Sequence, residues 1–477
     1  MKRSVQRVLS MAMAPIVGLV VAFAGSGPAA AQQTTEVPRF LTLQDAVRIA
    51  LEGSTRLGID QARLESSEKA RLNALFSLGP DLTVTAVNQR ATRTDFDSPQ
   101  FGGTVIDSIT TDSGTRRVFI DSTFSTGTLD TDEESKFKQV QVSGSVRLFD
   151  GFANWYRIGA AYDDVDANRL SRAYTKTDVQ TGVIQAYYDL LRAKLLLNVA
   201  KEAVDVAGEQ LERTQALYEL GSAARSDVLK SQVQLGQTRL TLVQARNRER
   251  QARDGLVYAM NLKSATPFAI DTTVVDPPQQ DFDFDAEVEH ALSNRLDLAA
   301  LRETEAAQGK RVVSARGPLF PTVDFRYNLS YSDQESQFRF GAQKTRNRSW
   351  TISSTWNVFD RYQTYANIGQ AKASRRIAEY NRKQTELDAI REIRNFVNDI
   401  REARERLQVA RENVARSEED LRLAQEKFRV GAGTILDTIT AESDLTSTKA
   451  AAVEAVVDFL IGRAQLSRAS GRPFAEL

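Results

Sequence analysis

The chain has 477 residues, and its 62 Lys and Arg residues balance 62 Asp and Glu residues, so the formal net charge is zero. This balance provides no general attraction to nucleic acid or to anionic lipid, and we expect no nucleic-acid partner. The chain contains no cysteine, which excludes disulfides, thiolate metal sites and cysteine nucleophiles.

The N-terminus has the pattern of a secretory signal peptide. A basic start is followed by an apolar stretch from Val8 to Ala24, and then by Ala29 and Ala31, which fit the small-x-small rule for cleavage. We therefore expect residues 1–31 to be a signal peptide, with an uncleaved anchor helix as the alternative. After Ala31 there is no continuous apolar run of the ~20 residues that a membrane helix needs. This leaves either a soluble mature chain or one that crosses a membrane as β-strands.

The mature chain reads as two copies of one unit. The segment Leu148–Asp150 matches Val358–Asp360 at an offset of 210 residues, and the same offset pairs Gly221 with Gly431. Each copy has the predicted order helix, strand, loop, strand, long helix, turn, helix. We assign the parts as follows: first repeat 32–262, proline-containing linker 263–284, second repeat 285–477.

The first copy contains an insertion. The offset between the copies is 241 residues at Pro80 and Pro321, but it falls to 210 residues by Phe149 and Phe359. The extra sequence is rich in Thr, Ser, Asp and Gly from about residue 92 to residue 135, so it predicts a long polar loop.

Both copies predict a long helical hairpin, over residues 152–262 and 361–470. Apolar and Ala residues recur at alternating spacings of four and three over residues 179–211, and again over residues 389–421. This is the heptad signature of coiled-coil packing. The first helix, of ~69 residues, would be on the order of 100 Å long, which suits a periplasmic crossing better than a compact core. A soluble structural coiled coil is the alternative.

Four segments alternate apolar and polar residues with period two, which is typical of strands with one apolar face. They lie at about residues 80–92, 138–149, 321–333 and 348–359. A half-buried soluble sheet and a lipid-facing barrel both fit this alternation. Charge on the polar face, aromatic residues suited to interfacial girdles and the adjoining helical rods favour the barrel. The predicted lipid-facing residues are Val140, Val142, Val146, Leu148, Val323, Phe325, Tyr327, Leu329, Trp350, Ile352, Trp356 and Val358.

Four strands cannot close a membrane barrel, since small barrels need about eight. Open sheet edges are not tolerated in lipid, because their unpaired N–H and C=O groups have no partner there. Strands in a membrane would therefore have to be shared among several chains.

At this point the sequence resembles the TolC family of outer-membrane export channels over nearly the whole mature chain. The resemblance rests on the duplication and on matching motifs at the junctions and tips. These are Leu148–Gly151 and Val358–Asp360 at strand-to-helix junctions, Phe320–Pro321 at a helix-to-strand junction, and the tip pairs Gly221/Asp227 and Gly431/Asp437.

The resemblance implies an α+β membrane protein in the outer membrane with its helical portion in the periplasm. Three chains would form a 12-stranded β-barrel continued by an α-helical tunnel. Such a homotrimer is the passive exit duct of a tripartite efflux pump or, alternatively, of a type I secretion system. Its implied partners are outer-membrane lipid, a periplasmic adaptor (membrane fusion) protein and an inner-membrane pump of RND, ABC or MFS type.

The resemblance also implies roles for the hairpin tips. Asp227, Asp437 and Thr440 would lie at the periplasmic aperture, where close-packed Asp437 carboxylates would repel one another and have raised pKa values. The alternative role for both aspartates is helix capping. The expected adaptor-docking residues are Gly221, Ser222, Ala223, Gly431, Ala432 and Gly433.

The sequence has no phosphate-binding glycine loop, zinc pattern or nucleophile elbow. We therefore expect no enzyme activity, no cofactor and no metal site. Two rival functions remain at this stage. A periplasmic adaptor typically has one hairpin per chain, so the duplication argues against it. A structural coiled-coil protein of the envelope would have no use for amphipathic strand pairs.

Overall fold

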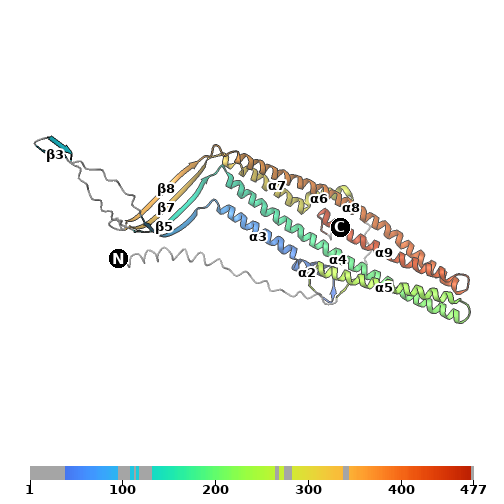
Figure 1. Ribbon diagram of the computed structural model, residues 1–477. Helices are drawn as coiled ribbons and strands as arrows, with labels where there is room; N and C mark the ends of the chain where they lie inside the picture. Colours follow the sequence, from blue (N-terminus) through green and yellow to red (C-terminus); the bar gives the residue numbers. More distant parts are fainter. Residues whose placement is uncertain are drawn as a thin grey trace.

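The structure, a computed structural model, describes residues 38–94, 108–111, 114–117, 132–263, 268–272, 282–336 and 343–473. The predicted signal peptide lies outside these residues. Figure 1 shows an elongated molecule, with strands β5, β7 and β8 at one end and two helical hairpin tips at the other. These three strands span Asp132–Phe149, Thr322–Ser336 and Gln343–Thr355.

The two repeats have the same order of elements, as predicted, except that the helix before each strand pair is broken in two. The first repeat contains α2 (Leu43–Gly53), α3 (Thr55–Phe76), β2 (Asp81–Thr94), β5, α4 (Ala153–Glu219) and α5 (Arg225–Ala259). The second repeat contains α6 (Phe284–Asn294), α7 (Leu296–Ser314), β7, β8, α8 (Gln363–Arg429) and α9 (Ile435–Ser470). The breaks fall at Ser54 and Arg295, which both have extended backbone.

The polar insertion contains more strand than predicted. β2 extends to Thr94 and β5 begins at Asp132, because the two strands pair without a break from Asp81–Ser145 to Thr94–Asp132. A short antiparallel pair, β3 (Ser108–Thr111) and β4 (Gly114–Arg117), also lies within the predicted loop. The rest of residues 92–135 lies outside the described part of the chain. Threonine, frequent here, has a high β-propensity.

The predicted linker also contributes to the fold. Its residues Ala269–Ile270 form β6, which pairs in parallel with β1 (Phe40–Leu41). Phe268 and Ile270 are buried in the core cluster around Leu190 of α4. This part of the linker therefore connects β1 to the first hairpin.

The main sheet is antiparallel, with strand order β2-β5-β7-β8. Two predicted lipid-facing residues lie beyond it, because β8 ends at Thr355 and the chain then turns toward α8. One is Trp356, whose Nε1 donates to the Leu319 carbonyl at 3.2 Å; the other is Val358. A β-bulge between Arg147 and Phe149 also leaves Leu148 out of register.

Matching caps join the strands to the long helices. Asp150 accepts a hydrogen bond from the Asn154 amide at 2.9 Å, and Asp360 accepts one from the Thr364 amide at 2.8 Å. The residue that precedes each helix, Phe152 or Tyr362, has left-handed backbone, with φ of 65° and 63°. The duplicated Phe-Asp motif therefore redirects the chain from strand to helix.

The predicted heptad seams are buried or half-buried. Val183, Leu190 and Ala200 lie inside the first hairpin, and Ile393 and Ile400 lie inside the second. In the second hairpin, Ile393 and Ile400 share a core cluster with Phe459 and Leu466 of α9. None of the described helices combines the length and the apolar character that a membrane span requires.

A buried arginine ties the α6–α7 break to the second hairpin. The side chain of Arg295 is 5% exposed. Its guanidinium donates to both carboxylate oxygens of Asp297 at 2.7 and 3.1 Å, to Glu392 of α8 at 3.0 Å and to the Ala469 carbonyl of α9 at 3.2 Å. Arg468 lies 3.7 Å from Glu392.

The same network reaches the first repeat. Arg468 of α9 forms an ion pair with Asp178 of α4 at 3.4 Å, and Arg56 of α3 approaches the other oxygen of Asp178 at 3.0 Å. Charged groups therefore connect helices from both repeats near the middle of the molecule.

Replacing Arg295 with Met should lower the free energy of unfolding by about 3 kcal/mol, because it leaves the half-buried carboxylates of Asp297 and Glu392 without their cation. The loss is measured by denaturant titration followed by circular dichroism. Arg302→Met is the matched control: Arg302 is exposed on α7, the helix that follows Arg295, and donates to the Leu292 carbonyl. The control should cost under about 1 kcal/mol. Equal losses in the two variants would contradict the role of the network.

Candidate functional site

Both hairpin tips use one backbone design. α4 and α8 each end before a glycine with positive φ, 77° at Gly221 and 75° at Gly431. Glycine adopts this left-handed conformation without steric cost. The Ser222 amide donates to the Leu217 carbonyl at 2.8 Å, and the Ala432 amide donates to the Lys427 carbonyl at 2.8 Å.

The third residue of each tip repeats the same pattern. The amide of Ala223 donates to Leu217 at 3.2 Å and the amide of Gly433 donates to Lys427 at 3.1 Å. The six predicted tip residues therefore lie together in two similar turns. Figure 1 shows both turns at the end of the molecule opposite the sheet.

Asp437 caps helix α9. Its Oδ2 accepts hydrogen bonds from the Thr434 amide at 2.9 Å and from the Thr434 hydroxyl at 2.8 Å, while the Asp437 amide donates to Thr434 Oγ1 at 3.2 Å. These hydrogen bonds, first those to the backbone, lower the pKa of Asp437 below its ordinary value. The capping hydrogen bonds within one chain therefore lower the pKa of Asp437, whereas repulsion from the Asp437 carboxylates of neighbouring copies was expected to raise it.

Asp227 holds the matching position in α5. Its Oδ2 accepts a hydrogen bond from the Ala224 amide at 3.3 Å, and Lys230 lies 3.7 Å from Oδ1. Thr440 is exposed on α9, and its hydroxyl donates to the Leu436 carbonyl at 2.9 Å. Both aspartates are thus first-turn caps at exposed tips, whereas Thr440 bonds within its own helix.

The predicted lipid-facing residues that lie within the paired strands form one continuous face. Residues directly opposite each other in an antiparallel pair share a face of the sheet. The apolar rows are Ala86–Val140–Tyr331, Val84–Val142–Leu329, Leu82–Gly144–Tyr327–Trp350 and Val146–Phe325–Ile352. Trp350 is 69% exposed and Ile352 is 59% exposed, so this apolar face is open in the single chain.

The opposite face is polar. Arg147 lies opposite Asp324 and forms an ion pair with it at 3.0 Å. Ser145 lies opposite Arg326, and Ser143 lies opposite Asn328. The sheet therefore separates an apolar surface from a hydrophilic one.

The apolar face has charged residues toward the loop end. Beyond Val140, the next row on this face contains Lys138, Asp333 and Lys344, with the last two 3.9 Å apart. On β8, Arg348 already lies opposite Leu329. The face is then on the order of 20–25 Å tall, at about 3.3 Å per residue.

Aromatic residues mark the helix end of the sheet, and sequence reasoning missed most of them. Phe149 and Phe152 meet edge to face at 5.5 Å, and Phe359 and Tyr362 do so at 6.3 Å. The signal that could have revealed them is the duplicated aromatic residue three positions after each Phe. Rings of this kind form the interfacial girdles of membrane β-proteins.

Two exposed apolar stripes on the helices were also missed. On α5 the stripe consists of Leu229, Val233, Leu240 and Val243, and on α8 it consists of Ile377, Tyr380 and Leu387. Their spacings of three, four and seven are those of a coiled-coil seam, so heptad analysis of both helix faces could have found them. Among the described residues, no cluster of three or more His, Asp or Glu side chains could hold a metal ion.

Comparison with known proteins identifies the family. The family model for outer membrane efflux proteins matches residues 48–262 and 288–472, well over half of the chain. CyaE of Bordetella pertussis is 25% identical over 304 residues, which cover 64% of this chain and 64% of CyaE, less than two thirds of its length. The outer membrane efflux protein BepC of Brucella suis is 23% identical over 340 residues, covering 69% of this chain and 71% of BepC.

Solved structures show the same fold. The outer membrane channel CmeC of Campylobacter jejuni superposes with a TM-score of 0.73 at 16% identity, covering 91% of this chain and 88% of CmeC. VceC of Vibrio cholerae superposes with a TM-score of 0.71 at 17% identity, covering 91% of this chain and 96% of VceC. The predicted fold class is therefore confirmed, and the chain belongs to the outer membrane efflux protein family, the TolC family of outer-membrane channels.

Proposed function

We propose that three copies of this chain form a passive exit duct, which conducts efflux substrates from the periplasm across the outer membrane. The observation that carries this proposal is the four-stranded sheet, which has one apolar face, one polar face and two edges without a strand partner in the described part of the chain. A sheet of this kind suits a barrel wall with lipid outside and water inside.

The sheet edges require more than one chain. β2 pairs only with β5, and β8 pairs only with β7, among the described strands. In lipid, each unsatisfied backbone group costs several kcal/mol. Joining β8 of one copy to β2 of the next removes this cost, and three copies supply twelve strands.

The helices continue the duct into the periplasm. α4 and α8 each contain 67 residues, so each is on the order of 100 Å long. The exposed stripes on α5 and α8 lie along these hairpins, and their heptad spacing suits helices of neighbouring copies. The copies would thus close a helical tunnel in the same way as the strands close the barrel.

The tips provide the contact with the rest of the machinery. They present the duplicated Gly221 and Gly431 turns at the end of the molecule farthest from the sheet (Figure 1). In our proposal a periplasmic adaptor binds there and links the duct to an inner-membrane pump, which supplies the energy. The name of the relative BepC as an efflux protein supports efflux cargo rather than secreted protein.

The proposal is tested on protein extracted from outer membranes in mild detergent. Native mass spectrometry should show a trimer, and planar bilayers should show stable channels. A freely dissolved single chain in the periplasmic extract would reject the duct. Accumulation of small toxic compounds in a deletion strain, with protein export intact, would confirm efflux, whereas the reverse result would assign type I secretion.

Ile352→Lys should block assembly, since Lys on the lipid face of a membrane strand costs about 2–4 kcal/mol at mid-depth. The expected result is a large loss of trimer from the outer membrane, measured by quantitative blotting of unheated samples. Ser353→Lys is the matched control, because its neighbouring position faces the polar side with Asp324. If both variants assembled equally well, the assignment of the two faces would be wrong.

Asp437→Ala should raise single-channel conductance or weaken block by divalent cations, because it removes acidic charge from the predicted aperture. The pKa of Asp437 is lowered, so block in the unaltered protein should persist through neutral pH and fade only below the ordinary range of aspartate. Recordings in planar bilayers at several pH values measure both effects.

Loss of the α9 cap must be separated from loss of charge in this experiment. Thr434→Ala breaks the cap but keeps the carboxylate, at a cost of about 1 kcal/mol to the helix. Its cation block should match that of the unaltered protein. Unchanged currents in Asp437→Ala would reject the aperture role.

A further inference from the structure

A buried acid lies between the two hairpins, close to their tips. Glu442 is in the second turn of α9, and it is 6% exposed. Among the described residues, its Oε1 has no hydrogen-bond partner, and neither does Oγ1 of Thr438, which is fully buried one turn closer to the tip. An unpaired carboxylate in such a place is costly.

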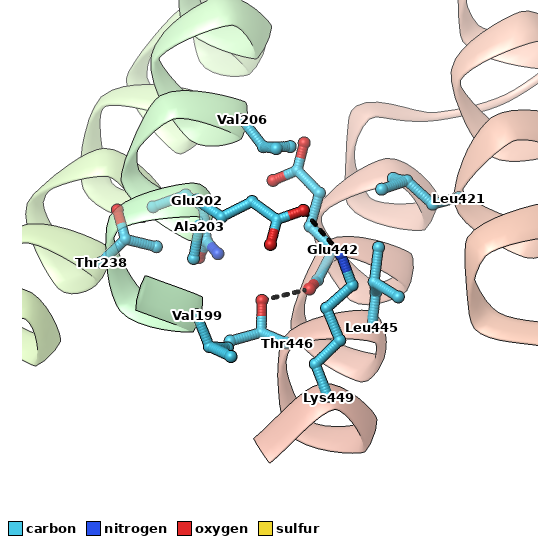
Figure 2. Close-up of a pocket in the computed structure, with 11 residues that line it drawn as sticks. Val199, Glu202, Ala203, Val206, Thr238, Leu421, Glu442, Leu445, Thr446 and Lys449 are labelled. Carbon is cyan, nitrogen blue, oxygen red and sulfur yellow. Dashed lines mark hydrogen bonds and ion pairs between the residues drawn. The ribbon is translucent and has the colours of Figure 1, made fainter. Parts of the chain in front are cut away.

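Glu442 borders a small cavity between α9 and the first hairpin (Figure 2). The cavity measures about 30 Å³ and is walled by residues of α4, α5, α8 and α9. A space of this size has room for about two water molecules at most. It therefore cannot give an ionised carboxylate the hydration that the charge loses on burial.

The charged groups around Glu442 are engaged elsewhere. Lys449 of α9 forms ion pairs with Glu202 of α4 at 2.6 Å and with Glu418 of α8 at 3.6 Å. Arg213 of α4 forms an ion pair with Glu209 at 2.9 Å. Figure 2 shows the Lys449–Glu202 pair on one side of the cavity.

The other groups that face Glu442 are uncharged. α5 contributes Gln234 and Thr238 to the cavity wall, and α8 contributes Leu421. Thr446 donates its hydroxyl to the Glu442 backbone carbonyl at 2.8 Å, not to the carboxylate. The surroundings therefore favour the neutral form of the acid.

The second repeat alone has this acid. At the offset of 210 residues, the position of Glu442 corresponds to Gln232 in the first repeat, which is exposed on α5. The buried carboxyl is thus a feature of one hairpin, at the place where α9 packs against α4.

We propose that Glu442 is a proton-controlled latch between the hairpins: the neutral acid holds the tip-side turns of α9 against α4, and its ionisation separates them. The latch concerns the packing of the chain and does not need conduction. If the proposed duct is correct, the latch also makes dilation of the tip more favourable as the pH rises.

The pH window follows from the burial of the acid. Burial raises the pKa of Glu442 from 4.5 to about 7, although the positive charge of Arg213 acts in the opposite direction. The packed state therefore keeps a proton that the separated state releases. Packing is fully favoured below the ordinary glutamate pKa, weakens as the pH rises toward about 7 and stays weak above it.

The absence of cysteine allows a direct test. Ala203→Cys places a single thiol in the cavity wall on α4, and its rate of alkylation by a maleimide reports separation of the hairpins. The rate is measured in detergent in two backgrounds, with Glu442 and with Glu442→Gln, so that the thiolate fraction largely cancels in their ratio. The ratio should rise by about tenfold or more between pH 5.5 and pH 8.5.

An electrostatic artefact would have the opposite sign, since an ionised Glu442 would raise the pKa of the nearby thiol and slow the reaction. Asp444→Asn is the matched control, because Asp444 is an exposed acid on the same helix, two residues from Glu442. The rise should persist in the Asp444→Asn variant. If Ala203→Cys fails to fold, Thr238→Cys places the thiol in the same cavity from α5.

A ratio that stays constant with pH, or a rise that disappears with Asp444→Asn, overturns the latch. The result is separable from the fate of the duct. Trimeric channels with a constant ratio would reject the latch alone. A pH-dependent ratio in a chain that never forms trimers would reject the duct and keep the latch.

Discussion

The requirement that every backbone N–H and C=O group in lipid has a hydrogen-bond partner governs the proposed assembly. One chain forms a sheet of four strands, and its outer strands β2 and β8 each have one neighbour among the described elements. The apolar rows around Val142 and Phe325 give this sheet a surface suited to lipid. In the proposed duct, these edges therefore require several copies to assemble, and assembly of the strands would also bring the attached helices together.

The helices can assemble together with the strands because the duplication attaches two equivalent hairpins to one sheet. Asp150 and Asp360 redirect the chain in the same way at the two junctions. The network around Arg295 then fixes the second hairpin to the first through Arg468 and Asp178. Buried charge of this kind is weak support for stability in itself, but loss of one member is costly. The network around Arg295 holds the two repeats in one relative position.

Much of this arrangement could be predicted from the sequence, because strong periodicity determines it. The heptad repeats that contain Leu190 and Ile393 predict the two hairpins, and the alternation around Val142 predicts a strand. Strand ends were predicted less well: Val358 continues the apolar alternation, yet β8 has ended at Thr355, because the turn toward α8 takes over. The alternation of apolar and polar residues alone does not show where a strand ends and the turn into the next helix begins.

The tips were predictable in position, and the sequence left two roles open for Asp437, a shared aperture and a helix cap. In the single chain its carboxylate is bound to Thr434 as a cap, and the aperture role stays a prediction. The burial of Glu442 was not predicted, because the sequence alone does not distinguish a buried acid on a long amphipathic helix from an exposed one. Only the packing of α9 against α4 shows that this side chain is enclosed, with no partner for its Oε1 in the described part of the chain. The duplication thus determines where the two tips lie. The two hairpins can acquire different roles at positions where the repeats differ, such as Glu442, which corresponds to Gln232 in the first repeat.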